Sequence, residues 1–235
     1  RLNGTHPGCE GTEATLSRSC ARGRPVTAAS AGANTLDAMR IATWNVNSIR
    51  ARVVRTVDFA VREGIDVLAM QEIKCKPEQF PYEAFEDAGY TVEAHGLNQW
   101  NGVAIASREP IENLQVGFPG MPGFAKGHDG PGAPLEARAL GATIGGVEVW
   151  SLYVPNGRGL DDPHYRYKLD WLEALRGYTA DTLAADPDRA LALTGDFNIA
   201  PTDADNGDPT VVEGVTTHVS VPQRAAFQAL LDAGL

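Results

Sequence analysis

The chain has 235 residues, a formal net charge of −10 and 43% hydrophobic residues. This composition fits a globular protein and argues weakly against a nonspecific polyanion binder, because nucleic-acid-binding domains are usually basic. No apolar run is long enough to span a membrane, and residues 1–38 lack the apolar core of a signal peptide, so we expect no membrane association. Of the three cysteines only Cys75 follows residue 38, which fits a reducing cytoplasm.

The first 38 residues differ from the rest of the chain. They begin with Arg1, precede the first methionine, Met39, and are rich in Gly, Ala, Ser and Thr without helical or strand periodicity. We therefore predict that residues 1–38 are a disordered or spurious N-terminal extension. Residues 39–235 are long enough to form one domain with a substantial core.

The apolar pattern after Met39 predicts strands mixed with amphipathic helices. Strands are expected at Arg40–Asn45, Asp66–Met70, Tyr90–Ala94, Gly102–Ser107, Ala137–Ile144, Val147–Val154 and Ala190–Thr194. Helices are expected at Ser48–Glu63, within Pro77–Ala88, at Asp162–Ala184 and at Pro222–Ala233. The pair Gly145-Gly146 predicts a hairpin turn, and the Gly- and Pro-rich residues 117–134 predict a long surface loop. Hairpins mixed with separate helices favour an α+β fold with two sheets flanked by helices.

Polar side chains stand at four places where a predicted strand meets a loop. The four segments are Trp44–Asn47, Gln71–Glu72, Tyr153–Gly157 and Gly195–Asn198. Three of them have a local explanation as well: Asn45 could cap the next helix, Glu72 could pair with Lys74, and Asp196 could form an Asx turn. Because the ends of adjacent strands can converge on one point, the combination favours a single site over four independent local roles.

The residue types at these strand ends indicate metal-assisted chemistry. Carboxylate and amide oxygens are hard ligands that suit Mg²⁺ or Mn²⁺. The sequence has no His/Cys zinc spacing, no Walker-type phosphate loop and no serine nucleophile elbow. Metal-assisted attack of water remains, and its usual target is a phosphate ester.

Five longer motifs follow one another along residues 39–235. They are MRIATWNVNSIRAR at 39–52, DVLAMQEIK at 66–74, WNGVAI at 100–105, YVPNG at 153–157 and GDFNIAPTD at 195–203. In this order they resemble the exonuclease III family of AP endonucleases, within the endonuclease/exonuclease/phosphatase superfamily. The resemblance implies a four-layered α/β/β/α sandwich of two mixed sheets flanked by helices, with the site at one edge of the packed sheets.

The resemblance also implies an activity and a cofactor. It suggests a Mg²⁺-dependent DNA repair nuclease, with Mn²⁺ as a substitute. Such an enzyme hydrolyses phosphodiesters 5′ of abasic sites and acts as a double-strand-specific 3′ to 5′ exonuclease. Its partner would be double-stranded DNA with abasic sites or 3′ ends, and the protein would act as a cytoplasmic monomer.

Roles at the site are carried over from the resemblance residue by residue. Glu72 would be the main metal carboxylate with Asn45 beside it, and Asp196 and Asn198 complete the metal set. Asp196 would orient or deprotonate the attacking water or protonate the leaving oxygen, and Asn198 would hydrogen-bond the phosphate. Tyr153 would act on the leaving-group side; the alternative is an aromatic half-buried against the sheet.

Further residues are candidates for contacting DNA. The predicted contacts are Asn47, Lys74, Trp100, Asn101 and Asn156. For Trp100, packing in the core is an equal alternative. Basic residues near the motifs could form a rim around the acids, or could be ordinary surface charges; they are Arg50, Arg52, Arg55, Lys74, Lys76, Arg158, Arg166 and Lys168.

The chain departs from the family pattern in two places. After Asp203 the run Asp205-Asn206-Gly207-Asp208 is more polar than the family's. The family's later Arg-Ile-Asp strand and Ser-Asp-His motif have no counterpart before Leu235, and His218 lacks the preceding Asp that would let it replace the latter. We therefore expect residues 39–235 to be a catalytic domain that lacks its C-terminal strands, with unpaired sheet edges and close to inactive.

Two other functions stay open from the sequence. A phosphoesterase acting on lipid or inositol phosphates would share Asn45, Glu72 and the Asp196 to Asn198 segment, but not the longer motifs. A non-catalytic DNA-binding remnant would keep the fold without turnover.

Overall fold

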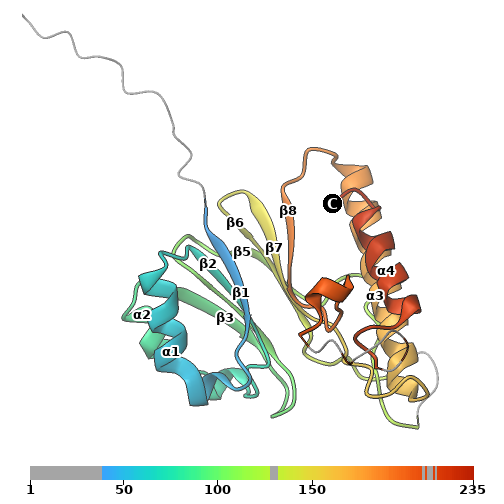
Figure 1. The fold of residues 1–235 in the computed structure, drawn as a ribbon. Helices are drawn as coiled ribbons and strands as arrows, with labels where there is room; N and C mark the ends of the chain where they lie inside the picture. Colours follow the sequence, from blue (N-terminus) through green and yellow to red (C-terminus); the bar gives the residue numbers. More distant parts are fainter. Residues whose placement is uncertain (1–38, 128–131, 208–209, 211–213, 215) are drawn as a thin grey trace, which may run out of the picture. The chain divides into compact units, whose positions relative to one another are not determined.

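A computed structural model describes residues 39–127, 132–207, 210, 214 and 216–235. These residues form four layers: helices α1 and α2, a first sheet, a second sheet, and helices α3 and α4 (Figure 1). The predicted α+β sandwich is confirmed. The predicted extension at residues 1–38 lies outside the described residues.

Each sheet contains four strands in the described part of the chain. The first has the order β1-β2-β4-β3 and the second the order β5-β6-β7-β8. The strands are β1 Ile41–Asn45, β2 Val67–Gln71, β3 Thr91–His95, β4 Val103–Ser107, β5 Glu112–Val116, β6 Ala139–Ile144, β7 Val147–Tyr153 and β8 Leu191–Asp196. Both sheets are mixed, because β1 pairs with β2 in parallel and β7 pairs with β8 in parallel, while the other pairs are antiparallel.

The helices cover the outer faces of the two sheets. They are α1 Ile49–Arg62, α2 Tyr82–Glu86, α3 Pro163–Ala185 and α4 Val221–Leu231, with short 3₁₀ turns at Pro77–Gln79 and Asp203–Asp205. All four predicted helices are therefore present, with ends shifted by one to a few residues. None of the helices in the described residues is long and apolar enough to cross a membrane.

Strand β2 shows how the sequence builds the layers. All five of its residues are buried, and successive side chains point to opposite faces. Val67 packs between the two sheets, whereas Leu68 and Met70 pack under α1 and α2. A third cluster, which includes Trp150 and Trp171, fills the space between the second sheet and α3. An uninterrupted apolar run is what a strand buried on both faces requires.

One strand was missed by the sequence analysis. β5 is mostly exposed, polar and interrupted by a register shift between Glu112 and Gln115, so it lacks the alternation that marks a half-buried strand. The predicted long loop is confirmed in its described parts, because residues 117–127 and 132–134 contain no helix or strand.

The packing of the sheets brings strand ends together. Within the described residues, β1 and β8 each pair on one side only, and they lie against one another where the two sheets meet (Figure 1). Their apolar side chains stay half-exposed, Trp44 in β1 and Leu193 in β8 among them. Because β1, β2 and β8 reach the same edge of the sandwich with their carboxyl ends, the groups that follow them share one place.

Candidate active site

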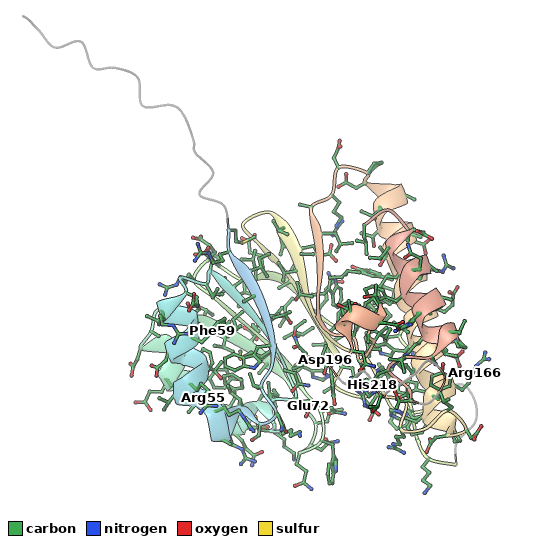
Figure 2. The ribbon with its side chains drawn as sticks, viewed as in Figure 1. Arg55, Phe59, Glu72, Arg166, Asp196 and His218 are labelled. Atoms are coloured by element: carbon green, nitrogen blue, oxygen red, sulfur yellow. The ribbon has the colours of Figure 1, made fainter. Side chains whose placement is uncertain are left out.

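The ends of β1, β2 and β8 deliver three polar side chains to one point. The Asn45 side-chain amide donates from Nδ2 to Glu72 Oε1 at 2.8 Å and to Asp196 Oδ2 at 2.7 Å. Asn45 thus bridges two acids from different sheets that are 124 residues apart in sequence. Figure 2 shows Glu72 and Asp196 facing one another between the sheets, with His218 beside Asp196. The predicted convergence of the strand-end acids is present.

Glu72 is held as a carboxylate by three donors. Besides Asn45, Tyr153 donates its hydroxyl to Glu72 Oε1 at 2.9 Å, and Lys74 Nζ lies 2.7 Å from Glu72 Oε2. Burial alone would raise the pKa of Glu72. The hydrogen bonds from Asn45, Lys74 and Tyr153 together lower the pKa by more than burial raises it, so the pKa lies below the ordinary value. The group is therefore ionised at neutral pH and able to hold a cation.

Asp196 is fixed by its own loop. Its Oδ1 accepts the Asn198 backbone N–H at 2.9 Å, which is the Asx turn considered from the sequence, while Oδ2 accepts from Asn45. The preceding residue must be glycine: Gly195 has φ +152°, and a Cβ there would lie 2.0 Å from the Leu152 carbonyl oxygen. Asp196 therefore forms the local Asx turn and also belongs to the shared site.

Tyr153, the last residue of β7, contacts Glu72 through its hydroxyl and Arg138 through its ring. The Arg138 guanidinium stacks 4.8 Å above the Tyr153 ring and pairs with Glu136 at 2.7 Å. Burial, followed by the hydrogen bond to Glu72, raises the pKa of Tyr153. The phenol therefore stays protonated and keeps its hydrogen for donation. The alternative of a half-buried strand-end aromatic also describes its position, since the side chain is half-buried.

Two amides and an imidazole line the other side of Asp196. Asn156 Nδ2 lies 3.3 Å from Asn198 Oδ1 and 3.2 Å from His218 Nε2, and His218 Nε2 lies 3.3 Å from Asn198 Oδ1. Asn198 also donates from Nδ2 to the Val154 carbonyl oxygen at 2.9 Å. A cleft of about 600 Å³ opens here, bordered by Asp196, Asn198 and His218. The sequence analysis did not place His218 at the site, and no local pattern predicted its position.

The predicted DNA contacts fall into two groups. Asn47, Lys74 and Asn156 surround the acids, and Lys74 donates to Asn47 Oδ1 at 2.5 Å. Trp100 is 71% exposed, so the alternative that it packs in the core is wrong. Asn101 is buried, with Nδ2 donating to Glu136 Oε1 at 3.3 Å, so its side chain does not face solvent.

Other local explanations are settled by the same contacts. The residue that caps α1 is Ser48, so the interpretation of Asn45 as that cap is wrong. Glu72 does pair with Lys74, yet this pair belongs to the site. Among the basic residues, Arg50 and Arg166 are exposed, whereas Lys168 is fully buried, so for Lys168 the surface alternative is wrong.

The donor set fits a hard divalent cation that keeps much of its water. Within residues 39–127, 132–207, 210, 214 and 216–235, no three His, Cys, Asp or Glu side chains come together as a metal cluster. Glu72 and Asp196 provide two carboxylates, and Asn45 could present Oδ1 if its amide turned over. Mg²⁺ is commonly bound by one or two carboxylates together with water and phosphate oxygens.

A larger hollow of about 1000 Å³ lies elsewhere, along α1. Its lining includes Arg50, Arg55, Phe59 and Arg62. Glu72 lines neither hollow, but Asp196, which shares Asn45 with Glu72, lines the smaller one. In Figure 2, Arg55 and Phe59 lie on α1 away from the two acids. The chemistry is therefore assigned to the smaller cleft.

Comparisons with known proteins agree with this geometry. Residues 42–228 match the model of the Endonuclease/Exonuclease/phosphatase family. The chain belongs to this family. It is 29% identical over 203 residues to exodeoxyribonuclease III of Haemophilus influenzae, across 84% of this chain and 73% of that protein. It is 27% identical over 202 residues to the DNA repair nuclease APEX1 of Danio rerio, across 83% of this chain and 60% of that protein.

Solved structures of family members have the same fold. A 3′ phosphatase from Neisseria, NExo, bound to a product DNA hairpin, is 36% identical with a TM-score of 0.72, covering 83% of this chain and 71% of that one. An AP endonuclease from Archaeoglobus fulgidus is 34% identical with a TM-score of 0.72, covering 83% of this chain and 70% of that one. This family member is therefore an AP endonuclease-like phosphodiesterase.

Proposed function

We propose that the protein is a Mg²⁺-dependent DNA repair nuclease that cleaves phosphodiesters 5′ of abasic sites and trims 3′ ends of double-stranded DNA. The observation that carries the proposal is the bridge from Asn45 to Glu72 and Asp196, which joins the two sheets at the cleft. Two acids and several amide donors at one point suit an anionic ester attacked by water.

Glu72 and Asn45 would hold the cation, with Asp196 and Asn198 beside it. When bound, Mg²⁺ supplies a Lewis acid that stabilises negative charge on phosphate oxygens. In its absence, Lys74 and the Asn45 amide offset the negative charge of Glu72. Mn²⁺ prefers the same oxygen ligands and is expected to substitute.

The remaining side chains would orient water and substrate. Asp196 is held through both of its oxygens, so it has a fixed direction from which to orient or deprotonate water, or to protonate the leaving oxygen. Asn198 uses one amide hydrogen on the Val154 carbonyl and has a second available for a phosphate oxygen. Tyr153 keeps its proton and can donate to a developing oxyanion.

The DNA would lie across the cleft mouth. Lys74 and Asn47 stand beside Glu72, and exposed Trp100 projects from the loop between β3 and β4. We further propose a cytoplasmic protein that acts as a monomer, because the site groups all come from one chain and the buried Cys75 is a free thiol.

The test is single-turnover cleavage of a duplex with one abasic site, with protein in excess and with or without Mg²⁺. Excess protein is used so that a single round of cleavage is followed. We expect metal-dependent cleavage 5′ of the abasic site that Glu72→Gln and Asp196→Asn abolish. Cleavage that persists in EDTA, or in both variants, would contradict the proposal.

The same assay separates the other functions. Metal-dependent DNA binding without any cleavage would favour a non-catalytic DNA-binding protein. Release of phosphate from a lipid or inositol head group, without DNA cleavage, would favour the other phosphoesterase. Neither alternative is supported by a specific contact in the structure, so the nuclease is the function that we propose.

A further inference from the structure

The single lysine of α3, Lys168, is fully buried behind the cleft. Its ammonium nitrogen lies 2.6 Å from the Asn198 carbonyl oxygen, 3.0 Å from that of Thr217 and 3.5 Å from that of Asn156, and it lies 2.5 Å from Gln223 Oε1. These four partners are neutral oxygens. They come from the loop after β7, the segment after β8, the turn before α4, and α4 itself.

An ammonium group at this position is costly. The side chain is fully removed from water, which disfavours its charged form. The four contacts include no carboxylate that would repay the desolvation of the charge. Lys168 also shares an inward face with Leu172 and Leu175, where an apolar residue would pack without this cost.

The convergence of the carbonyl groups explains why a cation is present. Three backbone oxygens and one amide oxygen point at one spot, and their dipoles repel one another unless a donor with several hydrogens lies between them. An ammonium group has three such hydrogens and no acceptor. Lys168 therefore holds together three segments that would otherwise separate.

We propose that Lys168 is a positioning residue that fixes the backbones of Asn156 and Asn198, and so sets the amides that face Asp196. Its consequence for cleavage rests on the proposed nuclease function. The backbone link itself does not rest on that function.

We call Lys168 and its four oxygen partners the clamp, and several contacts connect this clamp to the cleft. Asn198 has a left-handed backbone with φ 52°, a conformation that asparagine adopts more readily than most residues other than glycine. Its backbone N–H and side chain contact Asp196 and Asn156. The Ala200 N–H donates to the His218 carbonyl at 2.9 Å, which joins two of the three segments that Lys168 joins, those of Asn198 and Thr217. Loss of the clamp should therefore loosen both segments together.

The first test compares Lys168→Met with Thr179→Val in the full chain. Methionine keeps the length of the side chain without its charge. Thr179 is a fully buried residue of the same helix, and its hydroxyl bonds only to the helix carbonyl of Leu175, so it serves as a matched control. Hydrogen exchange is followed by mass spectrometry in peptides that cover residues 195–201 and 216–220. We expect exchange there to accelerate at least about tenfold in Lys168→Met and to stay unchanged in Thr179→Val.

A double variant separates positioning from stability. Lys168→Met leaves Gln223 Oε1 buried without its donor, whereas Lys168→Met with Gln223→Leu replaces both partners by apolar groups. We expect the double variant to recover the part of the lost Tm that comes from Gln223, while its exchange at residues 195–201 stays fast because the three carbonyl groups still lack their donor. If Lys168→Met alone does not fold, the double variant serves for the exchange measurement.

The kinetic test uses the same abasic duplex under single-turnover conditions. We expect the maximal rate to fall about 10²-fold, with the protein concentration at half-maximal rate changed less than about threefold, because displaced groups impair the transition state more than DNA binding. Exchange that is unchanged in both Lys168 variants would overturn the proposal. Fast exchange in the variants of a chain whose wild type never cleaves DNA would support the clamp and reject the nuclease.

Discussion

Strand β7 has a carboxylate network at each end, and the two are built differently. At its start, Glu148 is 3% exposed and accepts from Trp150 Nε1 at 2.7 Å, from Arg189 at 2.6 Å and from the Tyr178 hydroxyl. At its end, Tyr153 meets Glu72, whose side chain is 18% exposed and is held by an amide, a phenol and Lys74. The first network leaves its acid almost fully buried, whereas the second leaves Glu72 partly exposed and is linked through Asn45 to Asp196, which lines the cleft. We call them the closed and the open network.

The backbone follows the same division. Seven residues other than glycine have positive φ in the described part of the chain, and six belong to the open end: Asn47, Ser48, Glu72, Lys74, Arg158 and Asn198. Such conformations cost free energy and persist where the surroundings enforce them. The closed end contributes to the stability of the fold. That stability offsets the free-energy cost of the backbone conformations that hold the reactive groups at the open end.

The largest expected difference between the two ends is in activity. Glu72→Gln should lower the rate of metal-dependent DNA cleavage about 10³-fold or more, because it removes the charge that would hold the cation. The free energy of unfolding should change by less than about 1 kcal/mol, since the glutamine oxygen can still accept from Asn45 and Tyr153, and the lost ion pair with Lys74 is only partly buried. Single-turnover cleavage and urea unfolding measure the two quantities.

The control for Glu72→Gln is Glu86→Gln, which removes an exposed carboxylate from α2. Cleavage by this variant should match the wild type. A similar loss of activity in both variants would mean that overall charge, and not the open network, governs the reaction.

Glu148→Met should have the opposite effect. It leaves the buried Trp150 N–H without its acceptor and Arg189 without its partner, so we expect a loss of about 3 kcal/mol in the free energy of unfolding. The value is kept below that of a fully buried ion pair because the Arg189 side chain is 41% exposed and can be hydrated. Mn²⁺ affinity of the folded protein should stay within about twofold. An unchanged Tm would show that the closed network is not a source of stability.

The open end was largely predictable because its acids follow apolar runs. A continuous apolar run predicts a strand, so the positions of Glu72 and Asp196 after such runs identified two strand ends, although β2 is fully buried and β8 is half-exposed. The sequence could not show that Asn45 bridges the two acids, since that contact depends on how the sheets pack. It could not indicate His218 either, because a turn far along the chain folds back onto Asn198.

Lys168 was named among the basic residues near the motifs, but its burial was missed for a different reason. Lysine is almost never fully buried, so a surface position was the natural expectation. Its spacing from Leu172 and Leu175 already placed it on the apolar face of α3, and that conflict between residue type and helical position was the available signal. β5 carried no comparable signal, because an exposed polar edge strand resembles a loop.

Acid should weaken the open end through His164. Its Nδ1 accepts the Gly157 N–H at 3.1 Å, and burial, followed by Arg138 and Arg158, lowers its pKa to about 4. Because the pKa of the unfolded state is near 6.5, the unfolded chain binds the proton first, so stability present above pH 6.5 is lost as the pH falls towards 4. Between pH 7 and pH 5 the contribution should fall by about 2 kcal/mol.

The measurement compares urea unfolding of the wild type and His164→Gln at both pH values. Glutamine offers an acceptor to Gly157 but does not titrate, so the variant should lose less stability than the wild type between pH 7 and pH 5. Equal losses would assign the acid sensitivity to other groups. The half-buried His95 and His218, whose pKa values are also lowered, stay in both proteins and cancel in the comparison.

The smallest expected effect contrasts two tryptophans. Trp150 is buried in the closed network, whereas Trp100 is 71% exposed at the open end. If Trp100 stacks on a base or sugar, Trp100→Ala should weaken binding to an abasic duplex by about 1 kcal/mol, or roughly fivefold in Kd, with an unchanged Tm. Leu97→Ala in the same loop, where Leu97 is 50% exposed, is the matched control and should leave Kd unchanged. Equal weakening in both variants would indicate that loop shape, and not the indole ring, determines the affinity, and the open end would then contact DNA through its polar groups alone.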